Sequence, residues 1–546
     1  MPWRCRPQPC RRGMGEILQA RTSSTLLAPA SLTRPSGIWK LQVCPNCFGS
    51  SSDSRKLVQG LREVIGGASG SILEPAESGR FIDRLNPKLV KTLTVLGFSL
   101  PVVGYFWMIA RYSVNVIYQD QWSDITVIQH SHSRLIDWGT LWAQHNENRI
   151  FFPNLIVTIL ARTTHFNIRM EELLSGVMLV LATLLIIWSH KRRSPLTPWL
   201  YYCPVLILAC STVQYAAALW GFQMAWYLVL LALAATVALV DRVTLTWPVL
   251  LLAIVIAVVG TYSSVQGLLI WPIGLLLLYS RRRAVGFLAV WVIAGSLSAA
   301  LYLYNLNFTT GSVFAPSLTT HSISPLYFAT FAVGDILGYP IKFGGDNTAI
   351  LLLGVLLVAL AIVTLVLFGF RRDDTGGGPI GIALVCFGLM FAGLVAKGRA
   401  PLGFWAASSS GYTIYDLFIP AGIYLTLVGQ KQVAPHRRGD NRAIDSPSDP
   451  VRSRGRIHWI ALLAMGWTLA AVIVLQVVTG VGNGIAGARS MNSAELKAAS
   501  IERNIDHSSD EEVLANLAFY QSPSMTRRQA RIASELRLSL FSADDH

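Results

Sequence analysis

Long uninterrupted runs of apolar residues dominate the chain after residue 90. Runs of about 17–25 apolar residues are long enough to cross a bilayer as helices. They lie near residues 91–110, 173–189, 197–213, 224–240, 246–262, 265–280, 284–304, 347–370, 378–397, 412–429 and 457–479. The pattern predicts an all-α polytopic transmembrane protein with about eleven spans.

Lysine and arginine cluster in alternate short loops between these runs. Basic groups follow the second, sixth, eighth and tenth runs, at residues 191–193, 281–283, 371–372 and 431–456. Basic loops favour the cytoplasmic side of a membrane. All four groups fall on that side if the N-terminus is cytoplasmic, which places residues 111–172, 305–346, 398–411 and 480–546 outside.

Two further apolar stretches are not expected to cross, because counting either as a span would put a basic loop outside. The stretch 150–160 is short and ends near Arg162, so we expect a helix lying at the outer interface. The stretch 326–339 carries Asp335 between Gly334 and Gly338. A re-entrant segment covered by protein or by a wet cavity suits that pattern better.

The remaining segments suggest three regions. Residues 1–85 are rich in Arg, Ser, Gly and Pro and predict a disordered basic tail, with a transit peptide or a later start such as Met14 as alternatives. Residues 86–480 form the transmembrane domain, and residues 481–546 a small helical extracytoplasmic tail. Cys44 and Cys47 have the spacing of zinc ligands, but no second pair supports a zinc site.

Composition and charge point to the lipid bilayer as partner and argue against nucleic acid. Apolar residues make up 52% and charged residues 14% of the chain, against about 25% charged in soluble domains. The mean hydropathy is +0.47. The net charge of +15 lies mostly in the N-terminal tail and the short loops, where it orients helices.

The first outer loop begins with two acidic residues, Asp120 and Asp124, four positions apart. On a helix they would share a face. Such a pair can hold a divalent cation such as Mg²⁺ or Mn²⁺, or one acid can act as a general base. An ordinary solvated loop would carry the same residues, so both interpretations stay open.

The same loop ends in a second polar group: His145, Asn146, Glu147 and Arg149. The guanidinium group of arginine can donate two parallel hydrogen bonds to a phosphate. These four residues therefore suit a phosphate or a sugar diphosphate. Polar residues that cap the following apolar helix are the alternative.

Later segments on the outer side add further candidates for substrate binding: Gln266, Lys342, Lys397, Arg399 and Tyr412. Lys397 and Arg399 are notable because basic residues outside oppose the topology bias, and a lipid phosphate would explain them. Asp416 lies inside an apolar run, where a carboxylate is a candidate functional group.

The segments YQDQWSD, QHNENRIFFP, KGRAP, SGYTIYD and LRLSLF resemble uncharacterised bacterial membrane proteins similar to the GT-C glycosyltransferases. The resemblance covers residues 90–546. It implies a GT-C-like fold in the bacterial plasma membrane, with interfacial helices in the first outer loop. It also implies transfer of a sugar from a polyprenyl-phosphate donor to a glycan, lipid or protein acceptor of the cell envelope.

By this resemblance, Asp120 would be the base or a metal ligand and Asp124 its helper. Arg149, Lys397 and Arg399 would bind the lipid phosphate. The resemblance leaves open which sugar and acceptor are used, and the oligomeric state. A lipid-linked glycan polymerase or ligase, and a transporter or flippase without catalytic activity, remain alternatives.

Overall fold

The computed structural model describes residues 31–33, 40–42, 86–133, 137–307, 323–339, 347–369, 376–430, 450–518 and 521–542. The chain divides into two compact units, Met1–Arg84 and Leu85–His546. In the first unit, strand β1 (Ser31–Thr33) pairs antiparallel with β2 (Lys40–Gln42). The rest of the predicted basic tail, including Cys44 and Cys47, lies outside the described residues.

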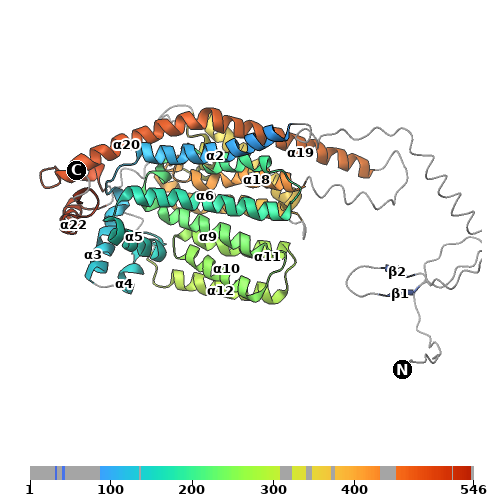
Figure 1. Cartoon of the computed structure of the whole chain (residues 1–546), viewed down its shortest axis with the longest axis horizontal. Helices are drawn as coiled ribbons and strands as arrows, with labels where there is room; N and C mark the ends of the chain where they lie inside the picture. The colour runs from blue at the N-terminus through green and yellow to red at the C-terminus, as the bar shows by residue number, and fades with distance from the viewer. Residues whose placement is uncertain are drawn as a thin grey trace, which may run out of the picture. The chain divides into compact units, whose positions relative to one another are not determined.

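The second unit is a bundle of long helices, several of which lie side by side (Figure 1). Within the described residues, eight segments are long and apolar enough to cross a membrane: Pro87–Tyr112, Ile168–Arg193, Trp199–Ala218, Gly221–Val240, Val285–Leu303, Thr348–Gly369, Gly378–Leu402 and Leu462–Arg503. Four apolar helices are shorter: Trp247–Thr261, Val265–Ser280, Pro325–Leu337 and Thr413–Gly429. Each predicted run coincides with one of these segments. The all-α, multi-helix membrane character is confirmed, and the count of eleven spans stays a prediction.

Several segments are continuous helices: α2 (Pro87–Tyr112), α6 (Ile168–Arg193), α9 (Met224–Val240), α10 (Trp247–Thr261), α11 (Ile270–Ser280), α12 (Val285–Leu303), α14 (Thr348–Thr364), α15 (Gly378–Arg399), α18 (Phe418–Gln430) and α19 (Pro450–Leu475). Others are broken into short pieces: η3 (Trp199–Tyr202), α7 (Cys203–Ala209), η4 (Thr212–Gln214), α8 (Tyr215–Ala218), η5 (Gly221–Gln223), η6 (Val265–Leu269), α13 (Pro325–Gly334), η9 (Asp335–Leu337), η11 (Ala400–Leu402), α16 (Phe404–Ala407) and α17 (Thr413–Asp416). Two π-helical turns, η10 (Leu365–Gly369) and η13 (Gln476–Gly480), follow α14 and α19.

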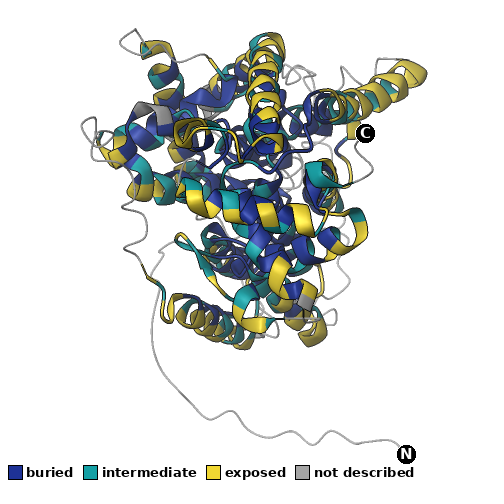
Figure 2. Ribbon diagram, turned by 90° about the vertical axis from the view of Figure 1, so that its left-hand side faces the viewer, coloured by how far each residue is buried: buried dark blue, intermediate teal, exposed yellow. Residues whose placement is uncertain are grey.

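The outer faces of the bundle carry large apolar side chains. Buried residues gather in the interior, and exposed residues lie on the outward sides of the helices (Figure 2). Leu352 and Val355 on α14 are 62% and 52% exposed, and Leu297 on α12 is 66% exposed. Such faces are unfavourable in water and favourable in lipid. They support the assignment to a membrane.

Short helices of the first outer loop gather at one end of the bundle (Figure 1). They are η2 (Gln119–Gln121), α3 (Trp122–Ser133), α4 (Trp138–Leu141) and α5 (Phe151–Thr164). The stretch 150–160, which we did not count as a span, forms most of α5. The C-terminal helices α20 (Val481–Arg503), α21 (Asp510–Asn516) and α22 (Pro523–Glu535) are followed by η14 (Ser539–Phe541).

The C-terminal helices pack on the segment between α2 and α6. The amide of Gln119 donates a hydrogen bond to the carbonyl of Leu517 at 2.7 Å, and that of Ser539 donates to the carbonyl of His165 at 2.8 Å. Glu502 on α20 accepts a hydrogen bond from the amide of Ile117 at 3.2 Å. Residues 481–546, predicted as a small helical tail, belong to the same compact unit as the helical bundle.

Asp241, at the C-terminal end of α9, joins the predicted basic loops that follow the second and sixth runs. It accepts hydrogen bonds from Nε of Arg193 at 3.0 Å and from Nε of Arg281 at 2.6 Å. Asp241 is fully buried, and the Arg193 and Arg281 side chains are 6% and 1% exposed. The basic loops after the second and sixth runs thus lie together, as the predicted topology requires.

Candidate functional site

A β-hairpin at the end of the first outer loop forms the frame of the candidate site. Strand β3 (Gln144–His145) pairs antiparallel with β4 (Asn148–Arg149), and His145 lies opposite Asn148. Asn146 in the two-residue turn has φ 50°, a left-handed conformation that asparagine tolerates better than most residues. This turn directs Glu147 away from the strand pair and leaves His145 on the strand.

Contacts to the ends of other helices fix the hairpin. Asn148 Oδ1 accepts hydrogen bonds from the hydroxyl of Ser264 and from the amide of Val265, both at 2.9 Å. The side chain of Gln144 donates to the carbonyl of Asn307 at 2.6 Å and accepts from its amide at 2.9 Å. The hairpin is therefore held by the residues that precede η6 and follow α12.

Arg149, predicted as a phosphate ligand, takes part in this anchoring. Its guanidinium group donates to the carbonyls of Tyr302 at 2.9 Å, Trp142 at 3.2 Å and Tyr304 at 2.5 Å. Arg149 is 5% exposed and lies over the ring of Trp142. Three of its five N–H donors thus bind backbone carbonyls. The structure gives Arg149 a positioning role for the hairpin and leaves it little surface for a substrate.

The hairpin brings His145 next to Asp120. Nε2 of His145 lies 3.8 Å from Oδ2 of Asp120, a distance that permits ionic attraction but is too long for a hydrogen bond. The two side chains are 18% and 17% exposed, although Nε2 of His145 is itself buried and has no hydrogen-bond partner among the described residues. On its other side, the imidazole ring packs against Phe222 with ring centroids 4.9 Å apart. The sequence placed these residues in separate groups, and the fold joins them.

Asp124 lies deeper than Asp120, beside a second buried carboxylate. It is 3% exposed, and Glu171 on α6 is fully buried. Oε2 of Glu171 accepts a hydrogen bond from the side-chain amide of Gln121 at 3.0 Å. A Cβ at Gly221 would meet this oxygen at 2.3 Å, so the approach of η5 to the pair requires glycine.

Burial and neighbouring charges shift the pKa values of Asp124 and His145. Burial raises the pKa of Asp124 well above its usual range, and repulsion from Glu171 and Asp120 adds to this while attraction to His145 opposes it. Burial lowers the pKa of His145, but attraction to Asp120, Asp124 and Glu147 outweighs it and raises the pKa overall. The site therefore favours the protonated forms of Asp124 and His145 more than water does.

An ion pair links the hairpin to the end of α15. Nη2 of Arg399 lies 2.8 Å from Oε1 of Glu147, across 252 positions of sequence. The two side chains are 30% and 39% exposed. An exposed pair of this kind contributes little to stability. Arg399 can therefore release Glu147 and bind another anion, such as a phosphate, in its place. We call Asp120, Asp124, His145, Glu147 and Arg399 the hairpin site.

The other predicted binding residues do not belong to the hairpin site, although Gln266 contacts Ser264, which holds the hairpin. Gln266 is buried and accepts a hydrogen bond from Ser264 at 2.8 Å. Tyr412 stacks on Trp226, with ring centroids 5.9 Å apart. Lys397 is exposed on the last turn of α15. Lys342 lies outside the described residues.

Sequence reasoning missed Glu171 and its partner Gln121. Glu171 and Glu172 directly precede the second apolar run, and both are buried. Two carboxylates at the start of an apolar run are unusual, because burial of an unpaired charge is costly. That signal could have marked them.

A second acidic pair lies inside the bundle. Asp416 on α17 and Asp335 on η9 are 1% and 6% exposed. Both carboxylate oxygens of Asp416 and one of Asp335 are buried without a hydrogen-bond partner.

We also tested the predicted divalent cation against the described residues. Among them, no three His, Cys, Asp or Glu side chains gather closely enough to hold a metal ion. A divalent cation at Asp120 and Asp124 stays a prediction, and the reaction proposed below uses none.

No protein-family model, curated protein or solved structure matches the chain.

Proposed function

We propose that the chain is a membrane glycosyltransferase that moves a sugar from a polyprenyl-phosphate donor to an acceptor outside the membrane. The observation that carries the proposal is the placement of His145 beside Asp120, at 3.8 Å and partly open to solvent. A partly exposed carboxylate can accept a proton from a hydroxyl group, and a neighbouring imidazole can orient it. The resemblance of the chain to GT-C proteins supplies the class of donor.

In the proposed reaction, Asp120 accepts the proton of the acceptor hydroxyl as its oxygen attacks the anomeric carbon of the donor sugar. The bond between that carbon and the phosphate oxygen breaks, and the electron pair leaves with the polyprenyl phosphate. The configuration at the anomeric carbon inverts. His145 orients the Asp120 carboxylate. Arg399 exchanges its exposed ion pair with Glu147 for the departing phosphate, which it binds through two N–H groups.

The test is transfer by the purified protein, with a panel of radiolabelled polyprenyl-phosphate sugars and membrane glycans as acceptors. Asp120→Asn should lower transfer by at least about a hundredfold, the usual contribution of a general base. Glu511→Gln is the matched control, since Glu511 is an exposed acid on α21 in the C-terminal segment. Both variants should keep the wild-type melting temperature. Full transfer by Asp120→Asn would refute the proposal.

The same assay tests the metal requirement. Transfer is measured with Mg²⁺, with Mn²⁺ and with EDTA. Loss of transfer in EDTA and its recovery with either ion would establish a divalent cation. Unchanged transfer in EDTA would exclude one.

The buried pair Asp335 and Asp416 favours a second candidate, transport without catalysis. Unpaired carboxylates inside a membrane domain often bind a proton or a cation that is coupled to transport. Broken helices meet at this pair, as they do at the binding sites of many transporters: α17 contacts η4 and η9, and η9 contacts η13. Transporter activity would appear as lipid or solute flux in proteoliposomes that Asp416→Asn abolishes and Asp120→Asn leaves unchanged.

A further inference from the structure

A polar groove lies beside the contact between helix α22 and helix α3, at the end of the bundle that carries the hairpin site. Its cavity volume is about 490 Å³, and it is lined by Gln129, Ser524, Arg527, Arg528, Arg531, Ile532 and Glu535. Three of these residues are arginines and one is acidic. Ile532 is the single apolar residue in the lining, so the groove offers no surface for a lipid chain.

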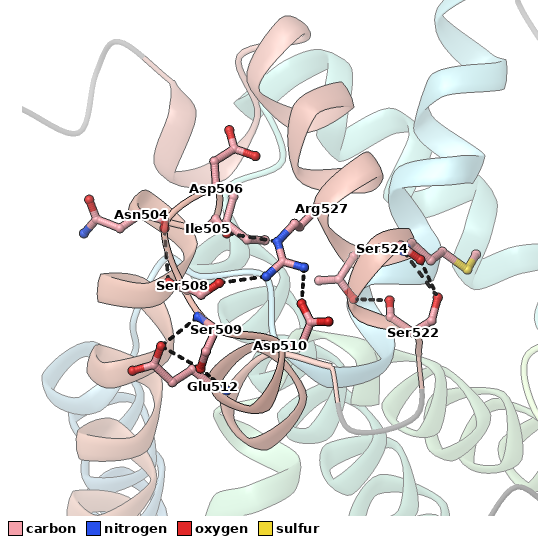
Figure 3. Close-up of polar contacts among 12 residues, drawn as sticks. Asn504, Ile505, Asp506, Ser508, Ser509, Asp510, Glu512, Ser522, Ser524 and Arg527 are labelled. Atoms are coloured by element: carbon pink, nitrogen blue, oxygen red, sulfur yellow. Dashed lines mark hydrogen bonds and ion pairs between the residues drawn. The ribbon is translucent and has the colours of Figure 1, made fainter.

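Arg527 links α22 to the neighbouring C-terminal segment through three hydrogen bonds (Figure 3). Its guanidinium group donates to Oδ1 of Asp510 at 2.5 Å, to the carbonyl of Ser508 at 2.7 Å and to the carbonyl of Ile505 at 3.2 Å. These bonds tie α22 to the segment between α20 and α21. The rest of α22 is thereby fixed against α3, where Gln529 donates to the hydroxyl of Thr126 at 3.4 Å.

Arg528 and Arg531 present two further guanidinium groups to the groove. Both are exposed, and their spacing of three residues places them on neighbouring positions of one helical face. Arg531 forms a 3.3 Å ion pair with Asp506, but the two side chains are 70% and 58% exposed. A pair so exposed to water is weak, and an anionic ligand can replace it.

The remaining lining groups suit a carbohydrate. The Gln129 amide, the Ser524 hydroxyl and the Glu535 carboxylate supply donors and acceptors for sugar hydroxyls. Guanidinium groups bind carboxylates and phosphates through paired hydrogen bonds. Together they match a sugar that carries an acidic group.

The groove also lies close to the hairpin site. Gln129 follows Asp124 by five residues on α3, a rise of about 7.5 Å along the helix with a rotation of about 140°. The groove and the hairpin site therefore lie along one helix, on different faces of it.

We propose that this groove binds an anionic glycan, whose carboxylate or phosphate groups are held by Arg528 and Arg531. The binding itself is independent of catalysis. The further role of this glycan as the acceptor rests on the proposed glycosyl transfer.

The test is direct binding to the full chain in phosphatidylcholine nanodiscs, measured by microscale thermophoresis. The probe is fluorescein-labelled tetragalacturonate, and its methyl-esterified form is the neutral match. At 50 mM NaCl the acidic probe should bind at least tenfold more tightly than the neutral one, and 500 mM NaCl should remove most of the difference. Equal binding of the two probes would overturn the proposal.

Paired variants locate the site. Arg528→Gln/Arg531→Gln should weaken binding of the acidic probe at least tenfold, whereas Lys497→Gln/Arg503→Gln removes the same charge from α20 and should leave it unchanged. An equal loss of probe binding in both variants would show a general effect of charge and would refute binding in the groove. Competition by phosphatidylglycerol nanodiscs that abolishes probe binding would assign the groove to lipid headgroups instead.

Asp120→Asn separates this inference from the proposed function. Normal probe binding together with lost transfer in this variant supports both. Full transfer by Asp120→Asn with binding that still depends on Arg528 and Arg531 refutes the transfer mechanism and leaves the glycan site standing. Wild-type binding by the arginine variant refutes the groove, whatever the transfer assay gives.

Discussion

Replacement of Asp241 by alanine should strongly destabilise the protein, because it removes the carboxylate that two buried arginines share. Arg193 and Arg281 approach Asp241 at 3.0 Å and 2.6 Å, with side chains 6% and 1% exposed. Loss of one partner of a buried ion pair costs about 3–5 kcal/mol. Arg193 also donates to the backbone carbonyl of residue 241 at 2.9 Å, a bond that alanine retains. We therefore expect the lower end of the range, about 3 kcal/mol.

The free energy of unfolding is measured by SDS titration in mixed micelles, with tryptophan fluorescence as the signal. Asp506→Ala provides the matched control. Its ion pair with Arg531 is 3.3 Å long but is largely exposed, so its loss should cost under about 1 kcal/mol. In the double variant Asp241→Leu/Arg281→Met, apolar residues replace one charge pair, and this should recover part of the stability.

The reasoning would be refuted if Asp241→Ala were no more destabilised than Asp506→Ala. That result would mean that the arginines find water or other acceptors at no cost. It would also mean that this carboxylate does not hold the ends of α6, α9 and α11 together.

Three further predictions concern the hairpin site. Burial and negative neighbours raise the folded pKa of Asp124 above the ordinary 3.8, so stability is lost as pH rises above that value. Asp124→Asn should raise the melting temperature increasingly from pH 4 to pH 8, and a lower melting temperature than wild type at pH 8 would contradict this. The folded pKa of His145 is raised from 6.5, so its contribution to stability is fully present below pH 6.5 and lost as pH rises through the folded value. The melting temperature of His145→Gln should therefore fall below that of wild type at pH 5.5 but approach it at pH 8.5. A difference in melting temperature that does not depend on pH would refute the charge argument. Gly221→Ala should lower the free energy of unfolding by about 1–3 kcal/mol, because its Cβ would meet Oε2 of Glu171 at 2.3 Å. Gly104→Ala is the control, since there is open space around Gly104, and it should be neutral or stabilising. Equal effects of the two variants in SDS unfolding would show that Gly221 is not tightly packed.

The positions of the long helices could be predicted from the sequence. Each of the eleven apolar runs coincides with an apolar helix in the described part of the chain, because a chain in lipid must satisfy its backbone hydrogen bonds within the helix. The basic loops also carried topological information: Arg193 and Arg281 were expected on one side and meet at Asp241. Asp241 itself was not singled out, since one acid at the end of an apolar run has no distinctive pattern.

The candidate site could be predicted only in part. Asp120 and His145 were both selected for their chemistry, yet nothing in their spacing shows that a hairpin folds one back onto the other. Arg149 shows the reverse case. Its residue type suggested phosphate binding, but the carbonyls of Tyr302 and Tyr304 at the end of α12 take its donors.

The sequence was enough to identify a membrane protein with many helices, because the length of an apolar run and the location of charges are local properties. Which polar residues meet depends on the packing of the whole bundle. Arg399 reaches Glu147 across 252 positions, and Glu171 reaches Gln121 across 50. Such contacts depend on how the helices pack and where their ends meet, and that geometry is set by the whole bundle rather than by any one segment.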